Sequence, residues 1–225
     1  MKGCFGMYNY FHSTGYRISF ISILAIGIYS YFKVRYIFKK YSKVSAKLSG
    51  SEVARRILDY NEVQDIEVAP NEGYSTNYFD SRSKKICLLE DVYNKYTIAS
   101  VCIAAHESAH AIQKDQSYIL RKLRCIFAPI MLVVSNVAFP IIIGVSIPSW
   151  DFAVKLGIIF IAMVIMFQLI TLPVEFDANR RALNSLLETG ILDESEIQSA
   201  KEVLTGIVLL ACLSSVFPTS STKEI

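Results

Sequence analysis

Long apolar runs constrain the fold of this chain more than any other feature of its sequence. Residues 126–148 and 152–174 are almost free of charged side chains, and residues 18–38 form a third run with basic residues near its end. Each run has about the 20 residues that a helix needs to cross a bilayer. The sequence therefore predicts three membrane-spanning helices. A shorter run, residues 203–217, is compatible with a fourth span, a re-entrant helix or a buried core helix.

The composition supports a membrane protein. Of the 225 residues, 52% are hydrophobic and 19% are charged, and the charged residues gather between the apolar runs. A mean hydropathy of +0.37 is too high for an ordinary soluble domain. The formal net charge of +3 requires no nucleic-acid partner, because basic residues beside anionic lipid headgroups account for it. The expected partner surface is the lipid bilayer.

Basic residues flank the apolar runs on one side only. They follow the first run, precede the second and follow the third: Lys33, Arg35, Lys39, Lys40, Lys43, Arg121, Lys122, Arg124, Arg180 and Arg181. Such flanks face the cytoplasm in inserted proteins. Residues 39–125 and 175–202 are therefore expected at the cytoplasmic face of the cell (inner) membrane, with the tail 1–17 outside. The first run could instead be a signal peptide, but no small-residue cleavage site follows it.

The region between the first two spans has the pattern of a small α+β domain. Residues 49–52 (Ser-Gly-Ser-Glu) precede apolar residues at helical spacing, at positions 53, 54, 57 and 58, and predict a capped amphipathic helix. Residues 66–69 and 86–89 read as short strands, with turns at 71–73 and 80–84. A helix is expected over 98–114, capped by Asn94 or Thr97. An edge of the strands could hold an extended peptide by backbone hydrogen bonds.

A metal-binding pattern lies inside that last helix. Residues 106–110 read His-Glu-Ser-Ala-His. Two histidines four residues apart project from one helix face, where both can bind one metal ion. Glu107 can reach a water on that metal and take its proton. For His106 and His110, a polar face that arises by chance on an amphipathic helix is the alternative.

A zinc site of this kind needs a third protein ligand. His12 is the one other histidine, and it lies in the tail on the opposite side of the membrane. The segment after the third span offers Glu175 and Asn179 on one helix face, whereas Asp177 points away. Glu175 is expected at the membrane boundary, level with the histidine helix. The alternative for Glu175 is an interfacial ion pair with Arg121 or Arg124.

The five cysteines contain no Cys-x-x-Cys pair, and their odd number fits a reducing compartment: Cys4, Cys87, Cys102, Cys125 and Cys212. Cys102 precedes His106 by one turn, so a thiolate ligand is conceivable. A small buried hydrophobic side chain is the expected role. Gln113, one turn after the histidines, is expected to serve packing.

Several segments together resemble a known family. They are 32–34 (FKV), 40–44 (KYSKV), 52–58 (EVARRIL), 104–107 (AAHE), 110–113 (HAIQ), 167–169 (FQL) and 171–178 (TLPVEFDA). The chain is similar in these segments to the YugP-like zinc-dependent membrane peptidases, the neutral zinc metallopeptidase 2 family. It looks more distantly like the HtpX and CAAX-type membrane proteases. Asn77 stands where a histidine is expected in relatives.

The resemblance implies a zinc metalloendopeptidase. Zn²⁺ would be held by His106, His110 and Glu175, with Glu107 as the catalytic base. Asn179 would accept a hydrogen bond from a ligand imidazole, where the distant relatives use an aspartate. Peptides or proteins, membrane proteins among them, would be the substrates.

The predicted fold class is mainly α: a multi-pass helical membrane protein with a small α+β zincin-like cytoplasmic domain. Residues 175–202 are treated as one helix that carries the third ligand. A second hypothesis is a non-catalytic membrane scaffold or chaperone-like protein in which zinc only holds the helices together. A base beside the first ligand argues against it, because a structural zinc site needs none.

Overall fold

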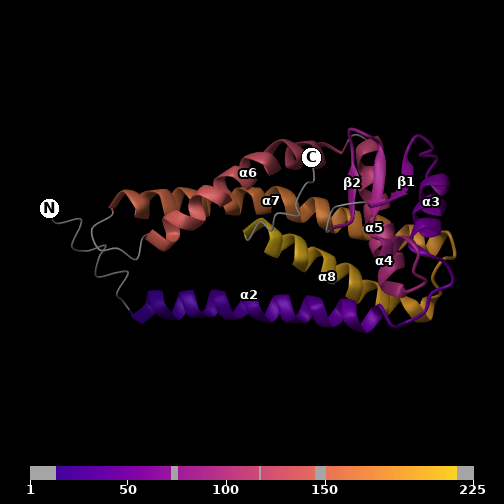
Figure 1. Cartoon of the computed structure of the whole chain (residues 1–225), viewed down its shortest axis with the longest axis horizontal. Coiled ribbons are helices and arrows are strands. Elements are labelled where there is room, and N and C mark those ends of the chain that lie inside the picture. Colours follow the sequence, from indigo (N-terminus) through magenta and orange to yellow (C-terminus); the bar gives the residue numbers. More distant parts are fainter. Residues whose placement is uncertain (1–13, 72–75, 117, 145–150, 217–225) are drawn as a thin grey trace.

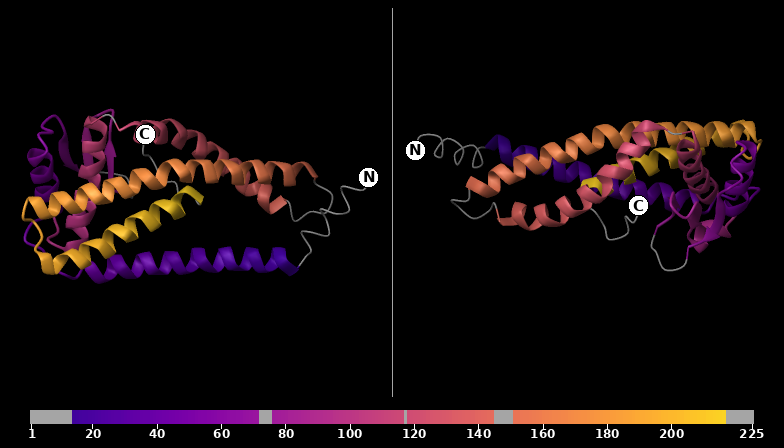
Figure 2. Two further views of the ribbon diagram at one scale, coloured as in Figure 1. Left: turned by 180° about the vertical axis from the view of Figure 1, so that it is seen from behind. Right: turned by 90° about the horizontal axis from the view of Figure 1, so that it is seen from above.

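The computed structural model describes residues 14–71, 76–116, 118–144 and 151–216. Within this part of the chain, four long helices extend from a compact head at one end of the molecule (Figures 1 and 2). They are α2 (Thr14–Tyr41), α6 (Ile119–Gly144), α7 (Asp151–Glu188) and α8 (Ile197–Val216). α6 packs along α7, and α8 lies between α7 and α2. The chain is thus mainly helical, as predicted.

The head is built on the central helix α5 and a small sheet. Its elements are α3 (Gly50–Tyr60), β1 (Glu67–Pro70), β2 (Tyr78–Asp80), β3 (Lys85–Leu88), α4 (Glu90–Tyr93) and α5 (Ile98–Asp115). The strand order is β1-β3-β2. β1 pairs with β3 in parallel and β2 pairs with β3 in antiparallel fashion, so that Ile86 stands opposite both Val68 and Phe79. The predicted strands correspond to β1 and β3. The sequence does not predict β2, because three residues are too few to display an alternating pattern.

Helix α3 begins as the sequence predicts. The Ser49 hydroxyl accepts a hydrogen bond from the Glu52 amide at 3.3 Å, and the Glu52 carboxylate accepts one from the Ser49 amide at 2.7 Å. This capping box satisfies two amide groups that a helix start leaves without partners. Gly50 is required at the next position, because a side chain there would overlap the Val92 carbonyl oxygen of α4. The start of α3 is therefore fixed against α4.

Helix α5 is buried along almost its whole length. Thr97 caps it by accepting a hydrogen bond from the Ser100 amide at 3.2 Å. α3 and the sheet cover one part of α5, and α7 and α8 cover another. The alanines at 104, 105, 109 and 111 allow these neighbours to approach closely. Ser108 is buried without cost to hydrogen bonding, because its hydroxyl donates to the Ala104 carbonyl at 2.8 Å. Polar side chains on α5 are thus held deep inside the head.

Helix α7 runs unbroken for 38 residues and passes through Pro173. Proline lacks the amide hydrogen that a helix uses, so the sequence favours a boundary near this residue. The structure instead ends α7 at Glu188, where Gly190 adopts a φ of +64°. A turn and the short 3₁₀ helix η1 (Glu194–Glu196) lead into α8. Residues 175–202, treated as one helix from the sequence, are therefore divided between α7 and α8.

Two helical stretches within the described residues are long and apolar enough to cross a bilayer: Ile159–Glu188 and Glu194–Ser214. A core helix of a soluble protein can meet the same criteria of length and composition. The apolar side chains of α7 are nevertheless exposed, among them Ile165 and Leu169, at 55% and 64%. Residues 1–13 of the expected tail, residues 145–148 of the expected second span and residue 217 lie outside the described residues.

Candidate metal centre

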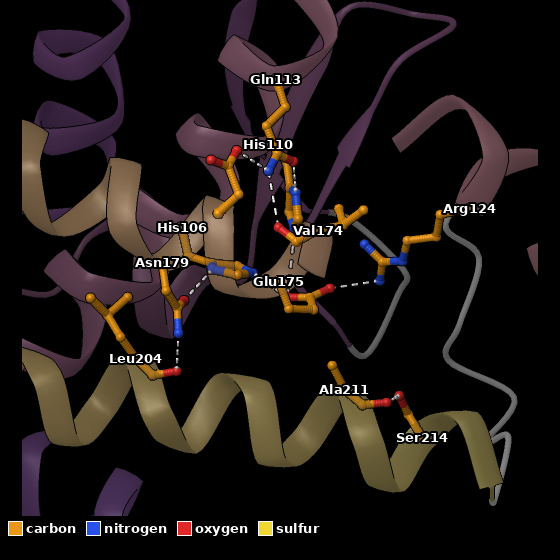
Figure 3. Close-up of polar contacts among 11 residues, drawn as sticks. His106, His110, Gln113, Arg124, Val174, Glu175, Asn179, Leu204, Ala211 and Ser214 are labelled. Atoms are coloured by element: carbon orange, nitrogen blue, oxygen red, sulfur yellow. Dashed lines mark hydrogen bonds and ion pairs between the residues drawn. The ribbon is translucent and has the colours of Figure 1, made fainter. Parts of the chain in front are cut away.

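His106, His110 and Glu175 come together in the interior of the head. The histidines lie one turn apart on α5, with ring centroids 4.5 Å apart, and Glu175 approaches from α7 (Figure 3). Glu175 Oε2 lies 3.2 Å from His106 Nε2 and 3.8 Å from His110 Nε2. All three side chains are buried. Glu175, 65 positions after His110 in the sequence, therefore directs a carboxylate oxygen at the same point as the two imidazoles.

Asn179 orients His106. Its amide nitrogen donates to the Leu204 carbonyl of α8 at 2.7 Å, so its oxygen faces His106 Nδ1, 2.9 Å away (Figure 3). An amide oxygen only accepts hydrogen bonds, so Nδ1 carries the hydrogen. The lone pair of His106 is then on Nε2, the atom that faces Glu175.

Gln113 does the same for His110. Its nitrogen donates to the Val174 carbonyl and to Asp177 Oδ2, both at 2.9 Å. Its oxygen therefore faces His110 Nδ1 at 3.0 Å. The expectation that Gln113 serves packing missed this contact. The spacing of Gln113, three residues after His110, is the signal that could have indicated it.

Arg124 of α6 approaches Glu175 from the other side. A guanidinium nitrogen lies 2.9 Å from Glu175 Oε1 (Figure 3). The sequence analysis gave an ion pair with Arg124 as an alternative role for Glu175. In the structure Glu175 makes this ion pair and also faces the histidines, because its two carboxylate oxygens have different partners. Each of His106, His110 and Glu175 is held by one further side chain.

The surroundings shift the pKa values of the two histidines in opposite directions. Burial alone would lower the pKa of His106, but the adjacent carboxylate of Glu175, together with the charge of Glu107, raises it. Burial lowers the pKa of His110 well below its ordinary value, and the positive charges of His106 and Arg121 lower it further.

The donor set fits zinc. Two imidazole nitrogens and one carboxylate oxygen are ligands that zinc takes, and the three atoms lie within 4.8 Å of one another. Tetrahedral ligands at zinc bond lengths stand about 3.3 Å apart. Glu175 Oε2 is also buried without a hydrogen bond of good geometry among the described residues. A buried acceptor that faces two imidazole nitrogens suits a cation.

Four further residues that the sequence singles out lie outside the cluster of His106, His110 and Glu175. Glu107 is buried beside His106, with 7% of its surface exposed. Cys102 is fully buried in the core, where burial raises the pKa of its thiol and keeps it neutral. Asp177 binds Gln113, Arg180 and Arg181. Asn77 accepts a hydrogen bond from the Leu89 amide at 2.8 Å.

Comparisons with known proteins show what the whole chain is similar to. The model of the family described as "Putative neutral zinc metallopeptidase" matches residues 16–212. The chain is 37% identical over 205 residues to the "Putative membrane protease YugP" of Bacillus subtilis (strain 168), an alignment that covers 88% of this chain and 91% of that protein. No solved structure matches the chain. A match over this much of the sequence shows that the chain belongs to the neutral zinc metallopeptidase family.

Proposed function

We propose that this protein is a membrane-embedded zinc metalloendopeptidase of the gluzincin type whose active site faces the cytoplasm. In this proposal His106, His110 and Glu175 hold Zn²⁺ and Glu107 is the catalytic base. The observation that carries it is the buried cluster of two imidazoles and one carboxylate, with a second carboxylate beside the first histidine.

The hydrogen bonds of Asn179 and Gln113 fix the proton of each histidine on Nδ1. Because amide oxygens of Asn179 and Gln113 accept from the two Nδ1 atoms, both Nε2 lone pairs are available to a metal without a change of tautomer. Bound zinc would supply an activated water and polarise a peptide carbonyl. Glu107 would accept a proton from that water and deliver it to the leaving amine.

The location is inferred from the long helices. The relative in Bacillus subtilis is named a membrane protease, and α7 and α8 have the length and composition of spans. Basic residues flank the proposed spans 18–38, 126–148 and 152–174 on the side of the head. A site at this level supports peptides or membrane-bound proteins as substrates.

The zinc content of detergent-purified protein tests the ligand set. We expect about one zinc per chain in the wild type and a loss of zinc in His110→Ala and Glu175→Ala. Glu188→Ala is the control, since it removes an exposed acid at the far end of the same helix and should retain about one zinc per chain. A Glu175→Ala protein that keeps its zinc, or a metal-free wild type, would refute the site.

Glu107→Gln tests the base. This variant should bind zinc as the wild type does and lose cleavage of a proteome-derived peptide library, read by mass spectrometry, by about 100-fold or more. Full cleavage by Glu107→Gln would overturn the assigned mechanism. The non-catalytic scaffold would be favoured by two results together. The wild type would bind zinc but cleave none of these peptides, and Glu107→Gln would have a normal phenotype in cells.

A further inference from the structure

Arg124 contacts the cluster from α6. It contacts Glu175 Oε1 at 2.9 Å, and Oε2 of the same carboxylate faces the two histidines. We infer that Arg124 is a positioning residue that presents a single oxygen of Glu175 to the metal. This inference rests on the proposed zinc site and adds a third outer contact to those of Asn179 and Gln113.

The physical reason lies in the freedom of a carboxylate. The last torsion of a glutamate side chain is broad, so a carboxylate without partners presents either oxygen, or both, to a cation. A guanidinium holds one oxygen in place by a charge-assisted hydrogen bond. The side chains of Glu175 and Arg124 are 2% and 12% exposed, so little water competes for this contact. Arg124 thus fixes the torsion on which the direction of Oε2 depends.

The basic side chain of Arg124 has a second role besides setting the orientation of a membrane span. The sequence places Arg124 with Arg121 and Lys122 as a cytoplasmic flank. Lys122 is exposed, whereas the Arg124 side chain is largely buried against Glu175. A residue that only marked the orientation of a span would not need a buried carboxylate as its partner. The two residues on one helix therefore offer a matched pair for experiment.

Zinc affinity, measured by competition with a chromophoric chelator, is the first readout. We expect Arg124→Leu to weaken zinc binding by about 10–100-fold, the effect typical of residues that orient a metal ligand. Lys122→Leu should change the affinity by less than about twofold. Arg124→Lys restores the charge without the planar fork, so its loss should be smaller than that of leucine. Wild-type affinity in both Arg124 variants would overturn the inference.

A double-mutant cycle separates positioning from a general effect on the fold. If Arg124 acts through Glu175, Arg124→Leu should alter the residual zinc affinity of Glu175→Ala by less than about twofold. An equal loss in both backgrounds would show that Arg124 acts elsewhere. Should the leucine variant fail to fold, by circular dichroism, the same cycle with Arg124→Lys decides the question.

The visible absorption of the Co²⁺-substituted protein is the second readout, because it reports the number of ligands around the ion. We expect Arg124→Leu to change this spectrum and Lys122→Leu to leave it unchanged. A metal-free wild type, or wild-type affinity in Glu175→Ala, would instead refute the zinc site itself. An unchanged spectrum and affinity in Arg124→Leu, with zinc lost from Glu175→Ala, would refute only the role of Arg124.

Discussion

Two side-chain amides determine which nitrogen of each histidine is available. An amide group has a donor end and an acceptor end, and here each donor end is already engaged, by the Leu204 carbonyl for Asn179 and by the Val174 carbonyl and Asp177 for Gln113. The acceptor ends must then face the imidazoles. Asn179 acts without the negative charge that an aspartate would bring, so it orients His106 with less effect on its basicity.

Replacement of Gln113 by glutamate tests this polarity. Gln113→Glu keeps the size of the side chain but removes both N–H donors and places a carboxylate against Asp177. We expect a loss of about 1–3 kcal/mol in stability, because buried acceptors then face one another. Thermal denaturation of the detergent-purified protein measures it.

Asp177→Asn should restore part of that stability, since the asparagine amide can donate to the new glutamate. In the wild-type background, the same Asp177→Asn substitution should not stabilise the protein. Equal effects of Asp177→Asn in the two backgrounds would show that the contact between residues 113 and 177 is not the cause.

At the scale of single elements, the start of α3 makes a measurable contribution. Ser49→Ala removes the hydroxyl that accepts from the Glu52 amide, which typically costs about 1 kcal/mol. In a protein of this size that corresponds to a fall of about 2–4 °C in the melting temperature. A melting temperature unchanged by Ser49→Ala would contradict the role of the cap.

The cap also predicts a dependence on pH. Hydrogen bonds from the Ser49 amide and then the Ser49 hydroxyl lower the pKa of Glu52 below its ordinary value of 4.5. The carboxylate therefore stabilises the fold fully above pH 4.5, and this stability is lost as the pH falls through the lower pKa of the folded state. Glu52→Gln retains the capping box without a titrating group. Its melting temperature should fall less between pH 5 and about pH 3 than that of the wild type.

Elements with local signals could be predicted from the sequence, and those that depend on packing could not. The cap of α3, the Thr97 cap of α5 and the strands β1 and β3 follow from neighbouring residues. β2 exists because three residues pair with β3. α7 likewise continues through Pro173, although the residue itself favours a helix boundary.

The same distinction applies to the candidate site. The spacing of His106 and His110 places them on one face of a helix, and the level of Glu175 beside a predicted span suggested its approach. Gln113 contacts Val174 of α7, 61 positions later in the sequence, and Arg124 contacts Glu175, 51 positions later. Both contacts form only when the helices pack. Such contacts depend on the relative rotation of helices, which residue spacing within one helix does not contain.

At the scale of the whole molecule, exposed apolar side chains gather on the long helices. α2 exposes Ile21, Ile28 and Phe32, and α7 exposes Ile161 and Met166. Apolar surface of this extent on a monomer indicates a membrane or another protein as its surroundings. We expect the protein to remain in the membrane fraction after an alkaline carbonate wash. Its release into the supernatant would contradict the proposed spans.

Cysteine labelling in intact cells tests the orientation. In a background without the native cysteines, a membrane-impermeant maleimide should label Trp150→Cys, because this residue lies between the predicted spans 126–148 and 152–174 and is expected outside. The same reagent should leave Lys95→Cys in the head unlabelled. Permeabilised cells should allow labelling of Lys95→Cys. The reverse pattern would place the candidate site on the outer side of the membrane.

The contact between Asn179 and the Leu204 carbonyl has a consequence for the order in which the protein is made. A ribosome releases residues from the N-terminus onward, so His106, His110 and Glu175 all emerge before residue 204. A nascent chain that stops short of this residue has the ligands but lacks the carbonyl that turns Asn179 toward His106. A helix that contributes no ligand, α8, thus completes the site, and an incomplete chain cannot carry the finished arrangement.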